Sequence, residues 1–337
     1  MHTLLTPVMA IVAVMVTSLS LKAAETPVLT IYTYDSFASE WGPGPAIEKT
    51  FEAECACDVN FVALDSSIGI LGRVQLEGPS SKADIVLGLD TNLMKTARDT
   101  GLFAPHGVSL DGRTSLPVAF ADDHFVPFDW GYFAFVYNSE AMATPPTSLK
   151  ALVNAPDDIR IVIQDPRTST PGLGLLLWVR SVYGDDAGEA WASLSPRIVT
   201  VTKGWWDAYS MFLDGEADMV LSYSTSPAYH IVVDGTDKYR AAAFEEGHYM
   251  QVEVAAMLKN APQPDLARQF MDFILAPDFQ SVIPTTNWMY PAALARSSLP
   301  PEFGQLIDPS PALLFDEELV AERRKTWVDE WLEVMSR

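Results

Sequence analysis

Basic side chains are scarce in this 337-residue sequence. It contains 22 Lys and Arg against 44 Asp and Glu, which gives a formal net charge of −22. A surface of that sign repels phosphate backbones and anionic lipid headgroups, so we expect no nucleic-acid or membrane-surface partner. The same field favours a cationic ligand. Because acidity also serves solubility in exported proteins, the charge alone does not define a ligand.

Cysteine is almost absent as well. Cys55 and Cys57 are the only two, and one residue separates them. A structural metal site needs more ligands than two thiolates, so we predict neither a metal nor a cofactor. Export to an oxidising compartment would permit a disulfide, although its ring would be very small and strained. The sequence leaves the pairing of the two cysteines open.

The sequence has only one long hydrophobic run, at residues 4–21. Small residues suited to cleavage follow it at Ala23 and Ala24, and we predict a signal peptide over residues 1–24. Its start departs from the usual pattern, because only the α-amino group and His2 stand in place of Lys or Arg. The alternative is an uncleaved anchor, since the run is just long enough to span a bilayer. Cleavage is the preferred interpretation because no second run of that length exists.

Internal repeats, low-complexity tracts and basic runs are also missing. Strand-like and helix-like segments alternate instead, with strands at 28–34, 59–64 and 84–89 and helices at 46–54, 67–76 and around 94–97. Such alternation predicts a parallel sheet with helices on both faces. A chain of this length has enough residues for two lobes, each with a full core.

An aromatic stretch at residues 125–137, FVPFDWGYFAFVY, interrupts this pattern. It predicts a strand that is too long for one small sheet and would run between two lobes. A second α/β series follows, with strands at 159–164, 198–202 and 219–223 and helices at 171–183, from 205 and from 226. A return strand at 251–258 and helices at 266–275 and 316–334 complete the chain. We therefore predict a hinged pair of α/β lobes joined by two long crossings.

The junction Asp165–Gly174, DPRTSTPGLG, connects a strand to a helix in the second series. A hydroxyl residue before Pro171 indicates the start of a helix. The hydroxyl oxygen accepts a hydrogen bond from a free backbone N–H, and proline has no backbone N–H that would stay unpaired in the first turn. The remaining amides and the positive end of the helix dipole predict an anion site. The alternative is a capped helix that binds nothing.

Two further junctions of this kind follow strands. Asp65-Ser66-Ser67 comes after the second strand, and Ser224-Thr225-Ser226-Pro227 comes after the strand that ends at Tyr223. Open α/β sheets bind ligands at the carboxyl ends of their strands. We therefore expect the three helix starts to face one cleft and to share an anionic group.

Aromatic residues gather near the same strand and helix ends. Flat rings sandwich flat heterocycles and attract quaternary cations. Trp205 and Trp288 stand in polar loop settings, so we predict that both contact the ligand. Trp178, Trp191, Trp327 and Trp331 lie on predicted helices and are expected to fill the core. The predicted wall residues are Tyr34, Trp41, Trp205, Trp206, Tyr223, Tyr229 and Trp288.

At these residues the chain resembles the periplasmic thiamine-binding proteins of bacterial ABC transporters. The resemblance is carried by YTYDSF (32–37), WGPGP (41–45), ADIVLGLD (83–90), FVPFDWGYFAFVY (125–137), QDPRTSTPGLGLLLW (164–178), VYGDDA (182–187), VTVTKGW (199–205), LSYSTSPAYHI (221–231), EGHYMQVEVAA (246–256) and NWMYP (287–291). It covers nearly everything after the predicted signal. The resemblance implies a type II periplasmic-binding-protein fold, in which two α/β lobes with a hinge enclose an interlobe cleft, related to ferric-ion and polyamine receptors.

The resemblance also implies which residues contact the ligand. They are Ser169, Thr170, Trp205, Tyr223, Ser224, Thr225 and Ser226, with Tyr229, Trp288, Tyr34 and Trp41 as aromatic walls. Ser66 and Ser67 replace the Asp-Gly that is usual at the second-strand junction, where amides and hydroxyls would still hold a phosphate. Asp65 is a candidate for the missing carboxylate. Trp206 is a second departure, because the family usually has a small polar residue there.

Pattern and resemblance together predict the organisation of the chain. We expect lobe 1 at 26–127 plus about 250–290, lobe 2 at 128–249, and a C-terminal helical segment at 291–337 whose lobe the sequence leaves open. The expected protein is a periplasmic monomer without catalytic residues. It would deliver thiamine or a phosphorylated thiamine to a membrane permease and ATPase. For the cationic thiazolium, Asp35 and Asp129 are candidate carboxylates, or else they cap turns.

Rival functions suit the same fold class. A ferric-ion receptor would need hard ligands, and such relatives use adjacent tyrosines, whereas this chain has no Tyr-Tyr pair. A polyamine receptor is the other binding alternative. A periplasmic phosphoesterase built on Ser169 would lack both a Gly-x-Ser-x-Gly elbow and a His-Glu-x-x-His motif. His230 falls within a predicted helix, where we interpret it as structural rather than as a base.

Overall fold

The computed structural model describes residues 26–336, so the predicted signal peptide lies outside the described residues. The first strand–helix series comprises β1 (Val28–Tyr34), α1 (Asp35–Ala38), α2 (Gly44–Cys55), β2 (Asp58–Leu64), α3 (Ser67–Glu77), β3 (Ile85–Asp90) and α4 (Met94–Asp99). β1 pairs in parallel with β2 and with β3, as expected for strands joined through helices. Within this series, the short helix α1 at the end of β1 was not predicted from the sequence. Further along the chain, α5 (Leu149–Val153), β8 (Tyr239–Ala241), α11 (Pro277–Gln280) and α12 (Ile283–Thr286) were not predicted either.

The second series repeats this arrangement. Its elements are α5 (Leu149–Val153), β5 (Ile161–Gln164), α6 (Thr170–Tyr183), α7 (Ala187–Leu194), β6 (Ile198–Thr202), α8 (Trp205–Leu213), β7 (Met219–Tyr223), α9 (Pro227–Val232) and β8 (Tyr239–Ala241). β5 pairs in parallel with β6 and β7. The predicted strand from residue 159 begins two residues later, at Ile161.

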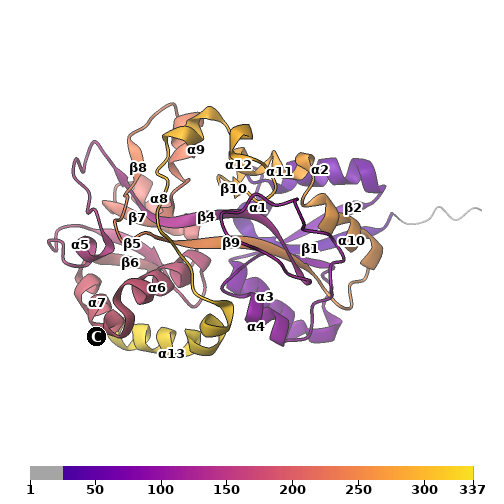
Figure 1. Ribbon diagram of the computed structural model, residues 1–337, viewed down its shortest axis with the longest axis horizontal. Helices are drawn as coiled ribbons and strands as arrows, with labels where there is room; N and C mark the ends of the chain where they lie inside the picture. Colours follow the sequence, from indigo (N-terminus) through magenta and orange to yellow (C-terminus); the bar gives the residue numbers. More distant parts are fainter. Residues whose placement is uncertain (1–25, 337) are drawn as a thin grey trace, which may run out of the picture.

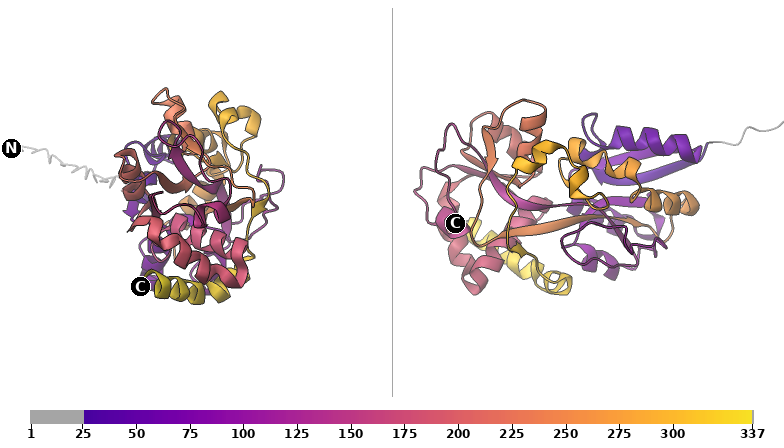
Figure 2. Two further views of the ribbon diagram at one scale, coloured as in Figure 1. Left: turned by 90° about the vertical axis from the view of Figure 1, so that its left-hand side faces the viewer. Right: turned by 45° about the horizontal axis from the view of Figure 1, so that its top comes forward.

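Two long strands cross between the series, β4 (Phe125–Asn138) and β9 (His248–Met257). The first half of β4 pairs with β9 and its second half pairs with β7. The sheet order is therefore β2-β1-β3-β9-β4-β7-β5-β6. Both strands pass through the middle of the molecule, with a group of helices at each end (Figure 1; Figure 2, right). The aromatic stretch at residues 125–137 is long because its two halves belong to different parts of the sheet.

The C-terminal segment contributes α10 (Pro264–Phe273), α11 (Pro277–Gln280), α12 (Ile283–Thr286), β10 (Tyr290–Pro291), β11 (Ala312–Leu313) and α13 (Glu317–Met335). The last helix, α13, packs against α4 of the first series and against α6 and α7 of the second. It therefore spans the two groups of helices along one side of the molecule (Figure 1). Of the helices between residues 26 and 336, none is long and apolar enough to cross a membrane. The limits of the two lobes stay a prediction.

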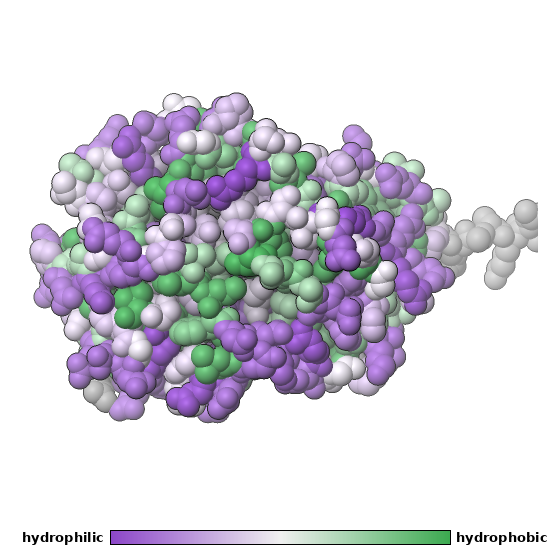
Figure 3. Space-filling view, viewed as in Figure 1, coloured by the Kyte–Doolittle hydropathy of each residue, from purple (hydrophilic) through white to green (hydrophobic). Residues whose placement is uncertain are grey.

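The core accounts for the apolar periodicity of the helices. The four helical tryptophans that were predicted to be buried, Trp178, Trp191, Trp327 and Trp331, are all at most 6% exposed. Burying large aromatic side chains of this kind stabilises the fold by roughly 2 kcal/mol or more each. On the face shown in Figure 3, hydrophilic residues cover much of the periphery and hydrophobic residues gather nearer the middle.

Two histidines are held in the core by hydrogen bonds. The Nε2 atom of His248 accepts from the Phe244 N–H at 3.0 Å, so Nδ1 carries the proton and donates to the Phe133 carbonyl at 2.8 Å. Burial lowers the pKa of His248 to about 4. His230 lies inside α9 between the Tyr209 hydroxyl and the Asp234 carboxylate, at 3.0 and 2.7 Å. These contacts agree with the structural role predicted for His230.

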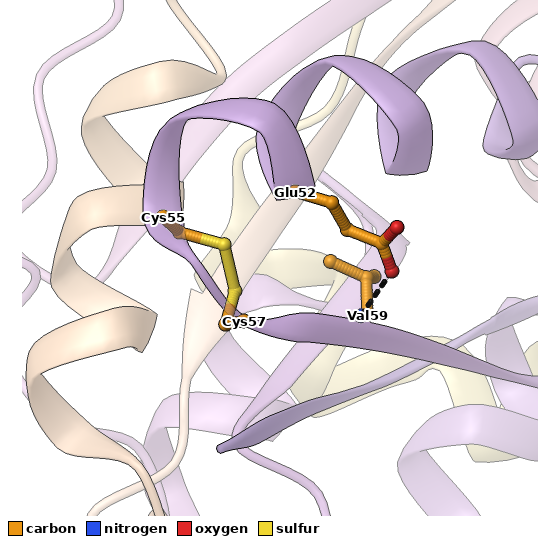
Figure 4. Close-up of a disulfide and its surroundings, with 4 residues drawn as sticks. All are labelled: Glu52, Cys55, Cys57 and Val59. Carbon is orange, nitrogen blue, oxygen red and sulfur yellow. Dashed lines mark hydrogen bonds between the residues drawn. A yellow bond between two sulfur atoms is a disulfide. The ribbon is translucent and has the colours of Figure 1, made fainter. Parts of the chain in front are cut away.

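Cys55 and Cys57 form a disulfide, which decides the question that the sequence left open (Figure 4). Cys55 is the last residue of α2, and Cys57 directly precedes β2. Ala56 between them has a left-handed backbone, with φ of 51°, and ends the helix. The Glu52 carboxylate accepts a hydrogen bond from the Val59 N–H at 2.8 Å, so it links the same helix to the same strand (Figure 4).

Candidate ligand-binding site

A cavity of about 650 Å³ lies where the two series face each other. Its size is within the range of small-molecule sites. The carboxyl ends of β1, β2, β5, β6 and β7 lead into its walls, and residues of β9 and α12 complete it. The lining residues are Tyr34, Asp35, Ser36, Trp41, Asp65, Ser66, Ser67, Ser169, Thr170, Pro171, Gly204, Trp205, Trp206, Asp207, Tyr209, Leu213, Tyr223, Ser226, Tyr229, Val233, Glu253, Thr285, Thr286, Asn287, Trp288 and Met289.

The helix starts of α3 and α6 both reach this cavity. Ser66 is the N-cap of α3, where its side chain accepts a hydrogen bond from the Gly69 N–H at 3.3 Å. Ser169 is the N-cap of α6 but accepts no capping hydrogen bond, so the hydroxyl cap predicted at this junction is not formed by Ser169. Thr170 Oγ1 is buried without a hydrogen-bond partner. The α6 start therefore offers hydroxyl groups that the helix itself does not use.

Gly172 explains why α6 begins so close to the sheet. A Cβ atom at this position would lie 2.5 Å from the Gln164 carbonyl oxygen and 2.7 Å from the Asp165 carbonyl oxygen. Neither backbone oxygen could move away cheaply. The missing side chain lets the first turn of α6 rest directly on the end of β5, which fixes the position of Ser169 and Thr170.

The third junction reaches the cavity only in part. Ser226 lines it, and its Oγ accepts from the Tyr223 N–H at 3.2 Å and hydrogen-bonds Ser222 Oγ at 2.7 Å. Ser224 and Thr225 are fully buried and are not among the lining residues. Thr225 lies against Met289, with Oγ1 3.7 Å from the sulfur. The two residues therefore support the wall from behind.

A further helix start, that of α8, lines the cavity through Gly204 and Trp205. The helix from residue 205 was not among the helix starts expected at the cavity, and Trp205 itself was predicted only as an aromatic ring that contacts the ligand. Its indole Nε1 donates to Ser222 Oγ at 2.8 Å, and its ring stacks on Tyr209 at 5.1 Å between centroids. Trp205 is therefore held in one orientation by both a hydrogen bond and a neighbouring ring.

The predicted aromatic residues meet around this one space. Tyr229 and Trp288 contact each other edge to face, with centroids 5.3 Å apart. Trp288 has a left-handed backbone, with φ of 55°, which costs a residue other than glycine about 1–2 kcal/mol. Tyr34 lies flat against Gly88, where a Cβ atom would come within 2.4 Å of its ring. Strain and close approach of this kind are common at binding sites.

Two contacts connect the two series at the cavity. Trp41 follows α1, Trp206 lies on α8, and their ring centroids are 5.7 Å apart. Both rings remain about half exposed. Next to them, Lys203 forms an ion pair with Asp65. Trp206, which departs from the resembled family, therefore lies opposite another tryptophan across the opening.

The charged lining residues are all acidic: Asp35, Asp65, Asp207 and Glu253. No Lys, Arg or His is among the lining residues of this cavity. Of the carboxylates proposed from the sequence, Asp35 lines the cavity, and burial raises its pKa. Asp129 is fully buried behind the lining. Such a cavity attracts cations and disfavours free anions.

Glu253 and Asp207 are the two lining carboxyls that sequence reasoning missed, and Glu253 is the more deeply buried of them. Glu253 lies on β9 and accepts a hydrogen bond from the Tyr34 hydroxyl at 2.8 Å. Burial, and then the neighbouring Asp129, raise the pKa of Glu253 well above the ordinary range. Burial also raises the pKa of the Tyr34 and Tyr223 hydroxyls, so both stay neutral. A charged residue in the otherwise apolar stretch 252–258 was the signal that could have identified Glu253.

Two α/β lobes with a ligand cavity at their strand ends define the class of two-lobed solute-binding proteins of type II. The same fold occurs in a ferric binding protein from Campylobacter jejuni, at a TM-score of 0.75 and 20% identity over 91% of this chain and 99% of that one. Residues 39–281 match the family described as bacterial extracellular solute-binding protein.

Closer relatives narrow the assignment. A thiamine-binding periplasmic protein from Escherichia coli is 54% identical over 311 residues, which cover 92% of this chain and 94% of the relative. A solved periplasmic thiamin binding protein superposes with a TM-score of 0.91 at 53% identity, covering 94% and 98% of the two chains. The chain belongs to the bacterial extracellular solute-binding protein family, in the group of the thiamine-binding periplasmic proteins.

Proposed function

We propose that this protein binds thiamine and its phosphate esters in the interlobe cavity and delivers them to an ABC importer. The observation that carries the proposal is the lining of the cavity, which combines eight Trp and Tyr rings with four carboxyl groups and no basic side chain. Thiamine has two flat rings, one of them a permanent cation. Stacking and cation–π contacts suit both rings. The names of the closely similar relatives support the same ligand.

The ligand contacts that we propose follow from the geometry. Tyr34, Trp41, Trp205, Tyr223, Tyr229 and Trp288 would form the walls around the rings. The starts of α3 and α6, at Ser66–Ser67 and Ser169–Thr170, would hold the hydroxyethyl or phosphate tail, because free amides and hydroxyls converge there. Ser224 and Thr225 would act only by supporting Tyr223 and Met289.

We also propose a periplasmic location after export, because the curated relatives are periplasmic proteins and the sequence begins with a signal-like run. The partner would be a permease and ATPase encoded elsewhere. The receptor would act as a monomer without catalysis. A phosphatase assay against thiamine phosphates tests the last point, since turnover by the purified protein would contradict it.

Calorimetric titration with thiamine, thiamine monophosphate and thiamine diphosphate tests the ligand assignment. We expect saturable binding with one molecule per protein. Spermidine and ferric citrate are the matched alternatives, because a polyamine has charge without flat rings and a ferric ion needs hard ligands. Binding of either alternative, with none of the three thiamine compounds bound, would overturn the proposal.

A further inference from the structure

Two carboxyl groups lie side by side at the inner wall of the cavity. Glu253 on β9 and Asp129 on β4 are direct partners in the register of neighbouring strands, so their side chains leave the sheet on the same face. Asp129 is fully buried and Glu253 is 5% exposed. Only Glu253 is a lining residue. The pair therefore has one member in contact with the ligand space and one behind it.

The groups around this pair are polar but not basic. The Tyr34 hydroxyl of β1 donates to Glu253 Oε2 at 2.8 Å, and the Asn287 amide after α12 donates to Asp129 Oδ2 at 2.6 Å. Asp129 Oδ1 is buried and has no hydrogen-bond partner. Among residues 26–336, none forms an ion pair with either carboxyl group.

The remaining titratable neighbours add negative charge or stay neutral. Asp90 on β3 is the other register partner of Glu253, and Arg324 of α13 partly offsets its charge. Tyr223 of β7 faces Glu253 as a neutral phenol. Two adjacent buried carboxylates without a cation repel each other and lose their hydration. Burial first, and then this mutual repulsion, raise the pKa of Glu253, so the pair holds a proton more tightly than a solvent-exposed carboxyl group would.

We propose that Glu253 is the residue that selects for the positive charge of the ligand ring, and that the Asp129–Glu253 pair releases its proton when the ring binds. The inference rests on the proposed function, because it takes the thiazolium of thiamine as the cation. The ring then sits beside Glu253 as the counter-ion that the protein itself does not supply. The O–H bond of the pair breaks, and the proton leaves to the buffer.

Calorimetry in two buffers of different ionisation enthalpy measures this exchange. At about pH 7.5, we expect thiamine binding to release close to one proton, since one carboxyl ionises for each ligand bound. The thiophene analogue of thiamine, whose ring is neutral, should bind roughly 10- to 100-fold more weakly and release none, because it offers no charge to pair with the carboxylate.

Two variants separate the roles of the pair. Glu253→Gln keeps the shape and the acceptor oxygen, and it should bind thiamine and the thiophene analogue equally, with no proton released. Asp129→Asn removes the repelling neighbour, so the pKa of Glu253 falls, although burial still raises it. The variant should keep or improve the affinity for thiamine while proton release falls. Glu189→Gln, at an exposed site on α7, is the matched control and should behave as wild type.

The outcomes also separate this inference from the ligand assignment. If wild-type protein fails to bind thiamine, the proposed function is wrong. If it binds thiamine without proton release, and Glu253→Gln still prefers thiamine over its thiophene analogue, the role of Glu253 is wrong while the function stands. A Glu253→Gln protein that does not fold leaves the decision to wild type and Asp129→Asn, where unchanged proton release in Asp129→Asn would overturn the pairing.

Discussion

Replacing Trp288 by Ala and by Gly separates binding from stability at one position. Trp288 lines the cavity, contacts Tyr229 edge to face at 5.3 Å, and holds a left-handed backbone with φ of 55°. Both substitutions remove the ring. Loss of a stacking surface costs about 1–3 kcal/mol of ligand binding, so each variant should bind thiamine roughly 5- to 150-fold more weakly.

The two variants should differ in folding stability. Alanine keeps a Cβ atom in the left-handed region, whereas glycine adopts it without cost, so Trp288→Gly should be about 1 kcal/mol more stable than Trp288→Ala. Titration calorimetry measures the affinities and urea denaturation measures the free energies of unfolding. Leu76→Ala, at an exposed position on α3, is the control and should change neither quantity appreciably. Affinity of Trp288→Ala within twofold of wild type would refute a wall role for this ring.

Three further predictions concern other parts of the molecule. Trp206→Ala removes the ring opposite Trp41, so stopped-flow dissociation of thiamine should accelerate several-fold, and an unchanged rate would contradict a closing role. In the folded protein the pKa of His248 is about 4, below the ordinary value of 6.5. As the pH drops, the unfolded state therefore binds a proton before the folded state does. The free energy of unfolding should fall as the pH drops from 6.5 towards 4. The loss in the free energy of unfolding should approach about 3 kcal/mol. Urea titrations of His248→Gln should show a shallower dependence of this free energy on pH. An equal dependence in the variant would exclude His248 as the cause. Replacing the Cys55–Cys57 pair by serines should cost at most about 1.5 kcal/mol in the same assay, because the closed loop spans only three residues, and a loss above about 3 kcal/mol would contradict that reasoning.

The order and type of most elements followed from local patterns. Strands β1, β2 and β7 were predicted with bounds that agree to within one residue, because apolar runs bounded by turn residues form strands largely irrespective of context. The helix starts of α3 and α6 were also placed from hydroxyl and proline positions. Short helices such as α1 escaped prediction, since four residues carry no periodic signal.

The lining of the cavity agrees with the predicted residues in composition but only partly in arrangement. Which side chains gather at the strand ends was readable from their chain positions, and most of the predicted residues line one cavity. Whether Ser169 caps its helix or Ser224 faces the ligand depends on rotation about a few backbone bonds. Such rotations depend on contacts with distant residues; Thr225, for example, lies against Met289, 64 positions along the chain. Local sequence does not encode them.

The sequence by itself determined an acidic, two-series α/β chain with aromatic and hydroxyl residues at strand ends, because these properties depend on composition and near neighbours. Tertiary structure alone decided how the two series meet. The register of β4 with β9 places Asp129 beside Glu253, residues 124 positions apart in the chain. The meeting of the two series at the cavity sets Trp206 of α8 opposite Trp41. Burial and mutual repulsion of the two carboxyls, and hence the charge selectivity that we infer, exist only once those distant segments lie together.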